Sequence, residues 1–331
     1  MTEILEQKKE GTWGVSQVWN ESLLEREERP VAPRDRIWAS ELGKSKVDIY
    51  LKLKGEKQTN PPNARSLRKF EAGNIWEWIV KIILQRAGIL QDAQRWTGYQ
   101  YPGLLQVSGK LDFVAGGKPD YERAMKEVEA IGLPEIFTRA GKRIIKYLQE
   151  KYLDGLDTRI IEVKSVSSFM FEAMEKTGKS SQNHRLQLFH YLKAENMERG
   201  LIVYVCKDDC RMMEFPVFNP SLVEDEYKAE IEAITGYYQR NEMPPLEKAI
   251  VYDKDIEKFS KNWHVAYSGY LTKLYGLKDQ MEFDEKYAPI AEKWNRVLAR
   301  IREGKEMTEN NKGVIAEIEK AGFNITELTA K

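Results

Sequence analysis

The chain has 331 residues, 42% hydrophobic and 31% charged, so it can bury a sizeable core as one large domain or two modest ones. Lysine plus arginine and aspartate plus glutamate both number 52, and this zero net charge argues mildly against a protein that only coats DNA. Cys206 and Cys210 are too few for a disulfide framework or a four-cysteine metal site, so we expect free thiols.

The N-terminal region lacks a signal-peptide pattern, and no apolar run approaches the roughly 20 residues that cross a bilayer. We expect a soluble, cytoplasmic protein without a membrane partner. Residues 1–35 are polar and include Pro30 and Pro33, which is typical of a loosely attached arm with room for one short helix. Periodic structure begins at Ile37, a lysine-rich loop is expected through 60–62, and a long helix is predicted over 64–87, ended by Gly88.

The pattern then changes to strands, two of which are predicted at 94–101 and 104–114 around the turn residues Pro102 and Gly103. The rest of the chain is expected to follow in the order helical insertion (120–152), strand (159–166), helices (168–177 and about 182–198), strands (201–206 and 211–217), and an almost entirely helical segment from 220 onward.

This order predicts an α/β core with a central mixed β-sheet flanked by helices, with helical additions at both ends. The expected divisions are an N-terminal arm at 1–35, a core at 36–275 with an insertion at about 120–155, and a helical C-terminal extension at 276–331.

An acid and an amine share one strand, at Glu162 and Lys164. Alternation along the strand puts both on one face, with Val163 turned to the other. A lone Glu-x-Lys is usually an exposed ion pair, but here the two lie in a largely apolar strand, where burial without a partner is costly. Asp112 is predicted at the middle of an adjacent strand. Two carboxylates and a backbone carbonyl suit a hard cation such as Mg²⁺, beside which Lys164 can help to activate water.

Two helices carry further candidates. Gln187 and Tyr191 are four residues apart, so they share a helix face and can point into one site, although a tyrosine on a core face is the commoner meaning of this spacing. His184 lies one turn earlier and can approach phosphate, but a solvent-exposed histidine is the simpler interpretation. Glu77 lies four residues after Gly73 among apolar neighbours, which allows partial burial, although an ordinary helix-surface glutamate is the commoner meaning of such a position taken alone.

Four motifs in order resemble the RecB-like, phage-type exonuclease branch of the PD-(D/E)XK nucleases over about 37–275: Gly73-x-x-x-Glu77, Gly109-x-x-Asp112, Glu162-x-Lys164 and Gln187-x-x-x-Tyr191. The resemblance implies a restriction-endonuclease-like core in which Asp112, Glu162 and the Val163 carbonyl bind Mg²⁺ or Mn²⁺ near Glu77. It also implies that Lys164 serves the attacking water, and that Gln187 and Tyr191 help to hold DNA and order the site.

One departure from that branch concerns an iron–sulfur cluster, for which many of its members carry one early and three late cysteines. This chain keeps the late aromatic frame of Trp263, Tyr267 and Tyr270, but Val265 and Ser268 stand where thiols would be. Cluster ligation needs cysteine thiolates, so none is expected here. The three aromatic residues would then have to pack this late aromatic segment, 263–270, against the core.

The leading hypothesis is therefore a metal-dependent deoxyribonuclease, an exonuclease acting in replication, recombination or repair on single-stranded DNA or duplex ends, with replication or recombination proteins as partners. A structure-specific or nicking endonuclease is a second hypothesis, since these motifs do not separate the two. The third is an inactive DNA-binding subunit with the same fold, against which the intact Asp112, Glu162 and Lys164 argue.

Overall fold

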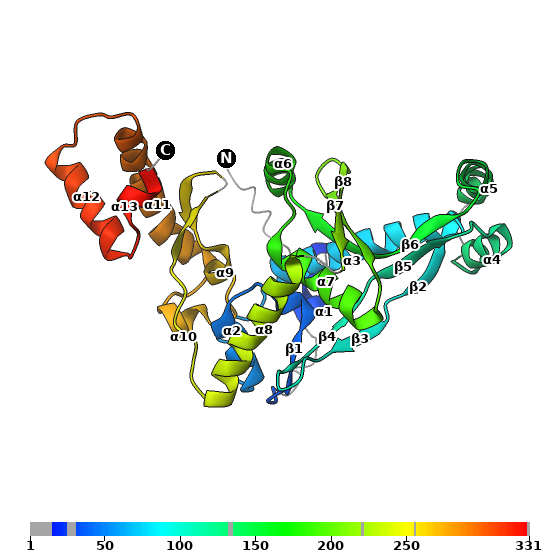
Figure 1. Ribbon diagram of the computed structural model, residues 1–331, viewed down its shortest axis with the longest axis horizontal. Helices are drawn as coiled ribbons and strands as arrows, with labels where there is room; N and C mark the ends of the chain where they lie inside the picture. The colour runs from blue at the N-terminus through cyan, green and yellow to red at the C-terminus, as the bar shows by residue number, and fades with distance from the viewer. Residues whose placement is uncertain (1–14, 25–30, 132–134, 220–221, 255, 330–331) are drawn as a thin grey trace, which may run out of the picture.

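A computed structural model of the chain describes residues 15–24, 31–131, 135–219, 222–254 and 256–329, coloured in Figure 1. Of the predicted N-terminal arm, it describes helix α1 (Val15–Leu24) and the residues from 31 onward, and the other residues of the arm lie outside this range. No described helix is both long and apolar enough to span a membrane.

The prediction of a lysine-rich loop is wrong in part, because this stretch contains helix α2 (Lys46–Leu53). The helix follows strand β1 (Arg36–Trp38) and a short 3₁₀ turn (Ala39–Glu41). Ser45 caps this helix by accepting a hydrogen bond from the Asp48 backbone N–H at 3.3 Å. Its aliphatic residues are spaced two apart and are buried round most of the helix, so the segment shows no amphipathic helical period among its lysines. The buried residues are Val47, Ile49, Leu51 and Leu53.

The long helix is confirmed as α3 (Ala64–Arg86). Asn63 caps its start by accepting from the Ser66 N–H at 2.9 Å, and Gly88, with φ of +69°, follows its end.

The predicted strand over 104–114 is wrong as a single element. It divides into β4 (Gln106–Lys110) and β5 (Phe113–Gly117), which lie in different sheets. At the break the Leu111 N–H donates to the Arg95 carbonyl at 3.0 Å, and the Gln94 N–H donates to the Asp112 carbonyl at 2.8 Å. Asp112 is therefore in the link between two strands. The strand predicted at 94–101 corresponds to β3 (Trp96–Tyr99), whereas β2 (Leu90–Ala93), which precedes it, was not predicted.

The central elements agree with the predicted order. The insertion is helical, and the strand carrying Glu162 is followed by two helices and a strand pair. The elements are α4 (Tyr121–Ile131), α5 (Glu135–Lys151), β6 (Leu156–Val166), α6 (Ser168–Thr177), α7 (Gln182–Glu195), β7 (Arg199–Cys206) and β8 (Met212–Phe218).

The larger sheet has five strands in the order β2-β5-β6-β7-β8, with β6 and β7 parallel and the other neighbours antiparallel. A smaller sheet has the order β1-β4-β3. Helix α3 lies on one face of the larger sheet and α7 lies on the other, and α8 (Val223–Arg240) packs against α7 (Figure 1). The chain therefore has the predicted mixed α/β fold, with a central mixed sheet flanked by helices.

The expectation of an almost entirely helical segment after 220 is wrong at one place, the hairpin of β9 (Ile250–Asp253) and β10 (Lys258–Lys261). Phe259 of this hairpin packs edge-on against Trp294, so the hairpin shares a core with the C-terminal helices. The helices are α9 (Trp263–Ala266), α10 (Leu271–Tyr275), α11 (Gln280–Arg302), α12 (Glu309–Lys320) and α13 (Ile325–Thr329).

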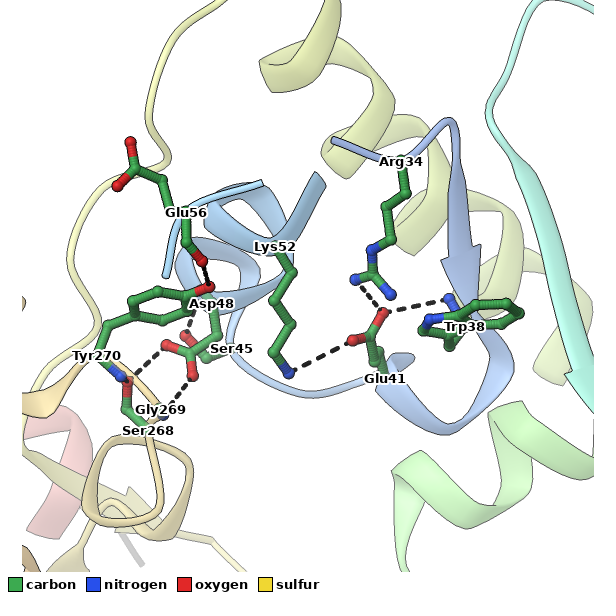
Figure 2. A network of polar contacts seen from close by, with 10 residues as sticks. All are labelled: Arg34, Trp38, Glu41, Ser45, Asp48, Lys52, Glu56, Ser268, Gly269 and Tyr270. Carbon is green, nitrogen blue, oxygen red and sulfur yellow. Dashed lines mark hydrogen bonds and ion pairs between the residues drawn. The ribbon is translucent and has the colours of Figure 1, made fainter. Parts of the chain in front are cut away.

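The late aromatic segment is tied to the core mainly by polar contacts (Figure 2). The Asp48 carboxylate accepts hydrogen bonds from the Ser268 hydroxyl at 2.6 Å and from the Gly269 N–H at 3.0 Å. Tyr270 is fully buried and donates to the Glu56 carbonyl at 2.9 Å. Trp263 and Tyr267 are exposed and stack on each other, so only one of the three predicted aromatic anchors packs into the core.

Candidate active site

Strand β6 carries the centre of the candidate site, and its neighbours β5 and β7 hold it inside the larger sheet. The Lys164 ammonium and the Glu162 carboxylate form an ion pair, which confirms that the two side chains share a face. Glu162 is only 1% exposed, while the Lys164 side chain is 22% exposed. The amine therefore stands between a buried acid and the solvent.

Asp112 reaches this strand from the link between β4 and β5. Its Oδ2 accepts a hydrogen bond from the Val163 N–H at 2.8 Å, across 51 residues of sequence. The break between the two strands makes this contact possible, since the chain changes sheets there and brings the carboxylate next to β6.

Glu77 approaches from α3 and is half-buried, as the sequence suggested. Its carboxylate accepts a hydrogen bond from the Gln94 side-chain amide at 3.4 Å. Gln94 also holds the Asp112 carbonyl through its backbone, in a left-handed conformation with φ of 56°. Sequence analysis missed Gln94, because a glutamine at the expected start of a strand carries no signal of a bridge between two acids.

Burial raises the pKa of all three carboxyl groups, and the charge of Asp112 adds to this effect at the other two. Burial, followed by the charge of Asp112, raises the pKa of Glu162 from 4.5 to about 8 and that of Glu77 from 4.5 to about 7. Burial raises the pKa of Asp112 as well, against the pull of Lys164. Although burial opposes the charged form of Lys164, attraction to Glu162 and Asp112 raises its pKa above the ordinary lysine value. Three carboxyl groups with raised pKa values thus face a single lysine in the site.

The chemistry of these donors fits a hard divalent cation, although no group of three or more histidine, cysteine, aspartate or glutamate side chains in the described part of the chain is arranged as a metal site. Glu162 Oε2 is buried and has no hydrogen-bond partner, which leaves a lone pair unused in a site rich in acids. Carboxylate and carbonyl oxygens are the protein ligands that Mg²⁺ prefers. Asp112 and Glu162 are therefore suited to hold such an ion, with the Val163 carbonyl or Glu77 as further oxygen ligands.

Gln187 and Tyr191 are both buried on α7 and face each other, as their spacing predicted. The Gln187 amide donates to the Tyr191 hydroxyl at 3.1 Å, and that hydroxyl donates to the Lys110 carbonyl at 3.0 Å. A Cβ on Gly109 would lie 2.8 Å from the Tyr191 ring, so this position favours glycine. The tyrosine thus fixes the end of β4, two residues before Asp112, and acts on the carboxylates through the backbone.

His184 is half-buried, so the interpretation of a solvent-exposed histidine is wrong. Its Nδ1 lies 2.8 Å from the Tyr204 hydroxyl, and burial together with the charges of Lys164 and Lys44 holds its pKa well below the usual value. The ring is therefore neutral at pH 7, and any contact with phosphate would be a neutral hydrogen bond. A DNA-binding role for His184 stays a prediction.

No protein-family model and no curated protein matches the chain. Among solved structures, the chain is similar to the crystal structure of SSO0001, with a TM-score of 0.42 and 13% identity, covering 71% of this chain and 91% of that one. An alkaline exonuclease from Laribacter hongkongensis, LHK-Exo, gives a TM-score of 0.37 and 13% identity, covering 62% and 89% of the two chains. The complex of LHK-Exo with dAMP gives 0.38 and 12%, covering 68% and 93%. Because these TM-scores are low, we infer function from the site alone.

Proposed function

We propose that the chain is a nuclease that hydrolyses DNA phosphodiester bonds with the help of Mg²⁺ or Mn²⁺. The observation that carries this proposal is the gathering of Glu77, Asp112 and Glu162 around one lysine, with Glu162 Oε2 buried and unpartnered. Several acids buried together lower the stability of the metal-free fold, and a cation bound between them would offset the repulsion.

A bound divalent cation would supply a positive charge next to the scissile phosphate and lower the pKa of the attacking water. Asp112 and Glu162 would hold the cation. The partly exposed ammonium of Lys164 can donate to the attacking water or to a phosphate oxygen, and its ion pair with Glu162 fixes it in place. Gln187 and Tyr191 hold the Lys110 carbonyl and so position the segment that carries Asp112.

The order of the four sequence motifs supports a finer assignment to the RecB-like branch and to a phage-type exonuclease of replication, recombination or repair. Of these motifs, Gln187 and Tyr191 are the most specific to that branch. An endonuclease built on the same site is the alternative, because the same groups would serve an internal phosphodiester equally well.

Labelled linear and circular DNA, incubated with Mg²⁺, Mn²⁺ or EDTA, tests the proposal. We expect cleavage only with metal, and loss of cleavage in Glu162→Gln. Asp157→Asn is the matched control, because Asp157 is an exposed acid on the same strand. Its carboxylate forms ion pairs with Arg159 and Arg199. Degradation of linear DNA alone indicates an exonuclease, and nicking of circles indicates an endonuclease. Binding without cleavage under every metal condition would contradict catalysis.

A further inference from the structure

The outer face of the smaller sheet carries two tryptophans that lie next to each other, although they are 58 residues apart in the sequence. Trp38 on β1 is opposite Ser108 of β4, and Trp96 on β3 is opposite Lys110, two residues further along β4. The two indole rings therefore point to one face, with centroids 5.6 Å apart and planes tilted by 50°. The inner face of the same strands is core, with Ile37 and Val107 fully buried.

Trp96 is 64% exposed, so its ring gains little from burial within the chain. A large apolar ring left in water next to a second one usually marks a binding surface. The positions that share this face carry no carboxylate side chain. They are Arg36, Trp38, Trp96, Gly98, Gln106, Ser108 and Lys110.

A buried carboxylate holds Trp38 in place (Figure 2). The Glu41 carboxylate accepts a hydrogen bond from the backbone N–H of Trp38 at 3.2 Å. It also forms ion pairs with Arg34 at 2.6 Å and with Lys52 at 3.4 Å. The Arg34 guanidinium lies 5.9 Å from the centre of the Trp38 ring. The backbone at Trp38 is thus fixed and a cation lies beside its ring, so the place of this residue on the face is set before a ligand stacks on it.

The face is continuous with the candidate active site. Lys110 is exposed at the edge beside Trp96, and Asp112 follows two residues later. The Lys110 charge lies near enough to lower the pKa values of Asp112 and Glu77, against the larger effect of burial. A strand whose bases lie on the tryptophans would therefore have its phosphates next to Lys110 and the carboxylates.

We infer that Trp38 and Trp96 form a stacking surface for the unpaired bases of single-stranded DNA, which leads the strand past Lys110 to the site. This inference rests on the proposed function and deepens it. Base stacking on an aromatic side chain needs an accessible base face, which a paired duplex hides within its own stack. Such stacking is worth roughly 1–3 kcal/mol per base, so the surface should favour single strands or frayed ends over intact duplex.

Binding measured in EDTA tests this without cleavage. Fluorescence anisotropy with a labelled oligothymidylate and with a labelled blunt duplex gives the two affinities, and quenching of intrinsic tryptophan emission reports stacking. We expect Trp96→Ala to weaken single-strand binding about 10-fold and to change duplex binding less than about 2-fold. Trp96→Phe should recover part of the loss.

Trp263→Ala is the matched control, because Trp263 is also exposed and stacks on Tyr267, outside the face that carries Trp38 and Trp96. It should leave single-strand affinity unchanged. Trp96→Ala with wild-type single-strand affinity, or with equal losses for both DNAs, would overturn the stacking surface. If the wild-type chain still cuts DNA in Mg²⁺, the proposed function survives that result, whereas a chain that neither binds nor cuts DNA overturns both.

Discussion

Two buried carboxylates of this molecule, Asp48 and Glu162, lie in contrasting surroundings. Asp48 on α2 has both oxygens occupied, one by the Ser268 hydroxyl and the other by the Gly269 N–H (Figure 2). Glu162 on β6 pairs with Lys164 through one oxygen, while the other is buried without a hydrogen-bond partner.

Burial raises the pKa of both acids, but the largest contribution from a neighbour has the opposite sign at the two. At Asp48 the hydrogen bonds from Ser268 and Gly269 favour the charged form and limit the rise in pKa. At Glu162 the charge of Asp112 adds to the effect of burial, and the pKa reaches about 8. A satisfied carboxylate of this kind stabilises the fold, whereas a carboxylate crowded by other acids is suited to hold a cation. Substitutions at the two places should therefore separate stability from activity.

The largest effect is expected for Glu162→Gln, which should abolish metal-dependent cleavage without lowering the melting temperature in EDTA. The substitution removes a cation ligand and also relieves repulsion with Asp112. Cleavage assays and thermal unfolding on one preparation measure both quantities. Undiminished cleavage would remove Glu162 from the site, and a large drop in melting temperature would make it structural, like Asp48.

Lys164→Ala should lower single-turnover cleavage by about 10²-fold or more, as for the loss of one preorganised stabilising group. DNA affinity should fall much less, since the remaining basic residues still contact the backbone. Equal losses in turnover and affinity would instead show that Lys164 only clamps phosphate.

Asp48→Ala is expected to lower the free energy of unfolding by about 2–4 kcal/mol, because the Ser268 hydroxyl and the Gly269 N–H lose a buried acceptor. Turnover per folded molecule should stay near wild type. Glu56→Gln is the matched control, since Glu56 joins the same segments through an exposed ion pair with Lys273, worth at most about 1 kcal/mol. Equal destabilisation by the two variants would contradict the assigned role of Asp48.

The pH dependence of the metal-free chain should also distinguish the two acids. The pKa of Glu162 is raised from 4.5 to about 8, so between these values the folded chain keeps a proton that the unfolded chain has released. The free energy of unfolding should then fall as the pH rises from about 5 to about 8. Denaturant titrations in EDTA at several pH values measure this slope. Glu162→Gln should flatten the slope between about pH 7 and pH 8, while Glu77, with a pKa of about 7, still contributes below pH 7. A slope between pH 7 and pH 8 that is retained in this variant would assign it to other groups.

The smallest effect is expected for Tyr191→Phe, which removes the hydrogen bonds to Gln187 and to the Lys110 carbonyl. Stability should fall by about 1 kcal/mol and turnover by about 10-fold, because Asp112 is held less firmly. Thermal unfolding and single-turnover assays on the same preparation separate the two. Normal turnover per folded molecule in both Tyr191→Phe and Gln187→Ala would make the pair purely structural and would remove the support for the RecB-like branch.

Local spacing was sufficient to predict several parts of the site. Alternation along one strand placed Glu162 and Lys164 on the same face, and a separation of four residues placed Gln187 and Tyr191 together on a helix. The mixed α/β fold followed from the order of strands and helices, because each element leaves its own period in the sequence.

Contacts between distant segments could not be read in this way. The strand break at Asp112, the bridge from Gln94 and the tie between Asp48 and Ser268 all depend on backbone turns and on partners far along the chain. Helix α2 and the hairpin of β9 and β10 were missed because they are short and their charged residues leave no clear apolar period.

By itself, therefore, the sequence determined which residue types share a strand or a helix face, because those relations repeat every two or every three to four residues. Only the tertiary structure decided which acids meet. It left Glu162 crowded by Asp112 and Glu77, and it gave Asp48 two hydrogen-bond donors from a segment about 220 residues away. The physical reason is that the protonation state and the stability of a buried acid depend on the nearest donors and charges in space, which separation along the chain does not specify.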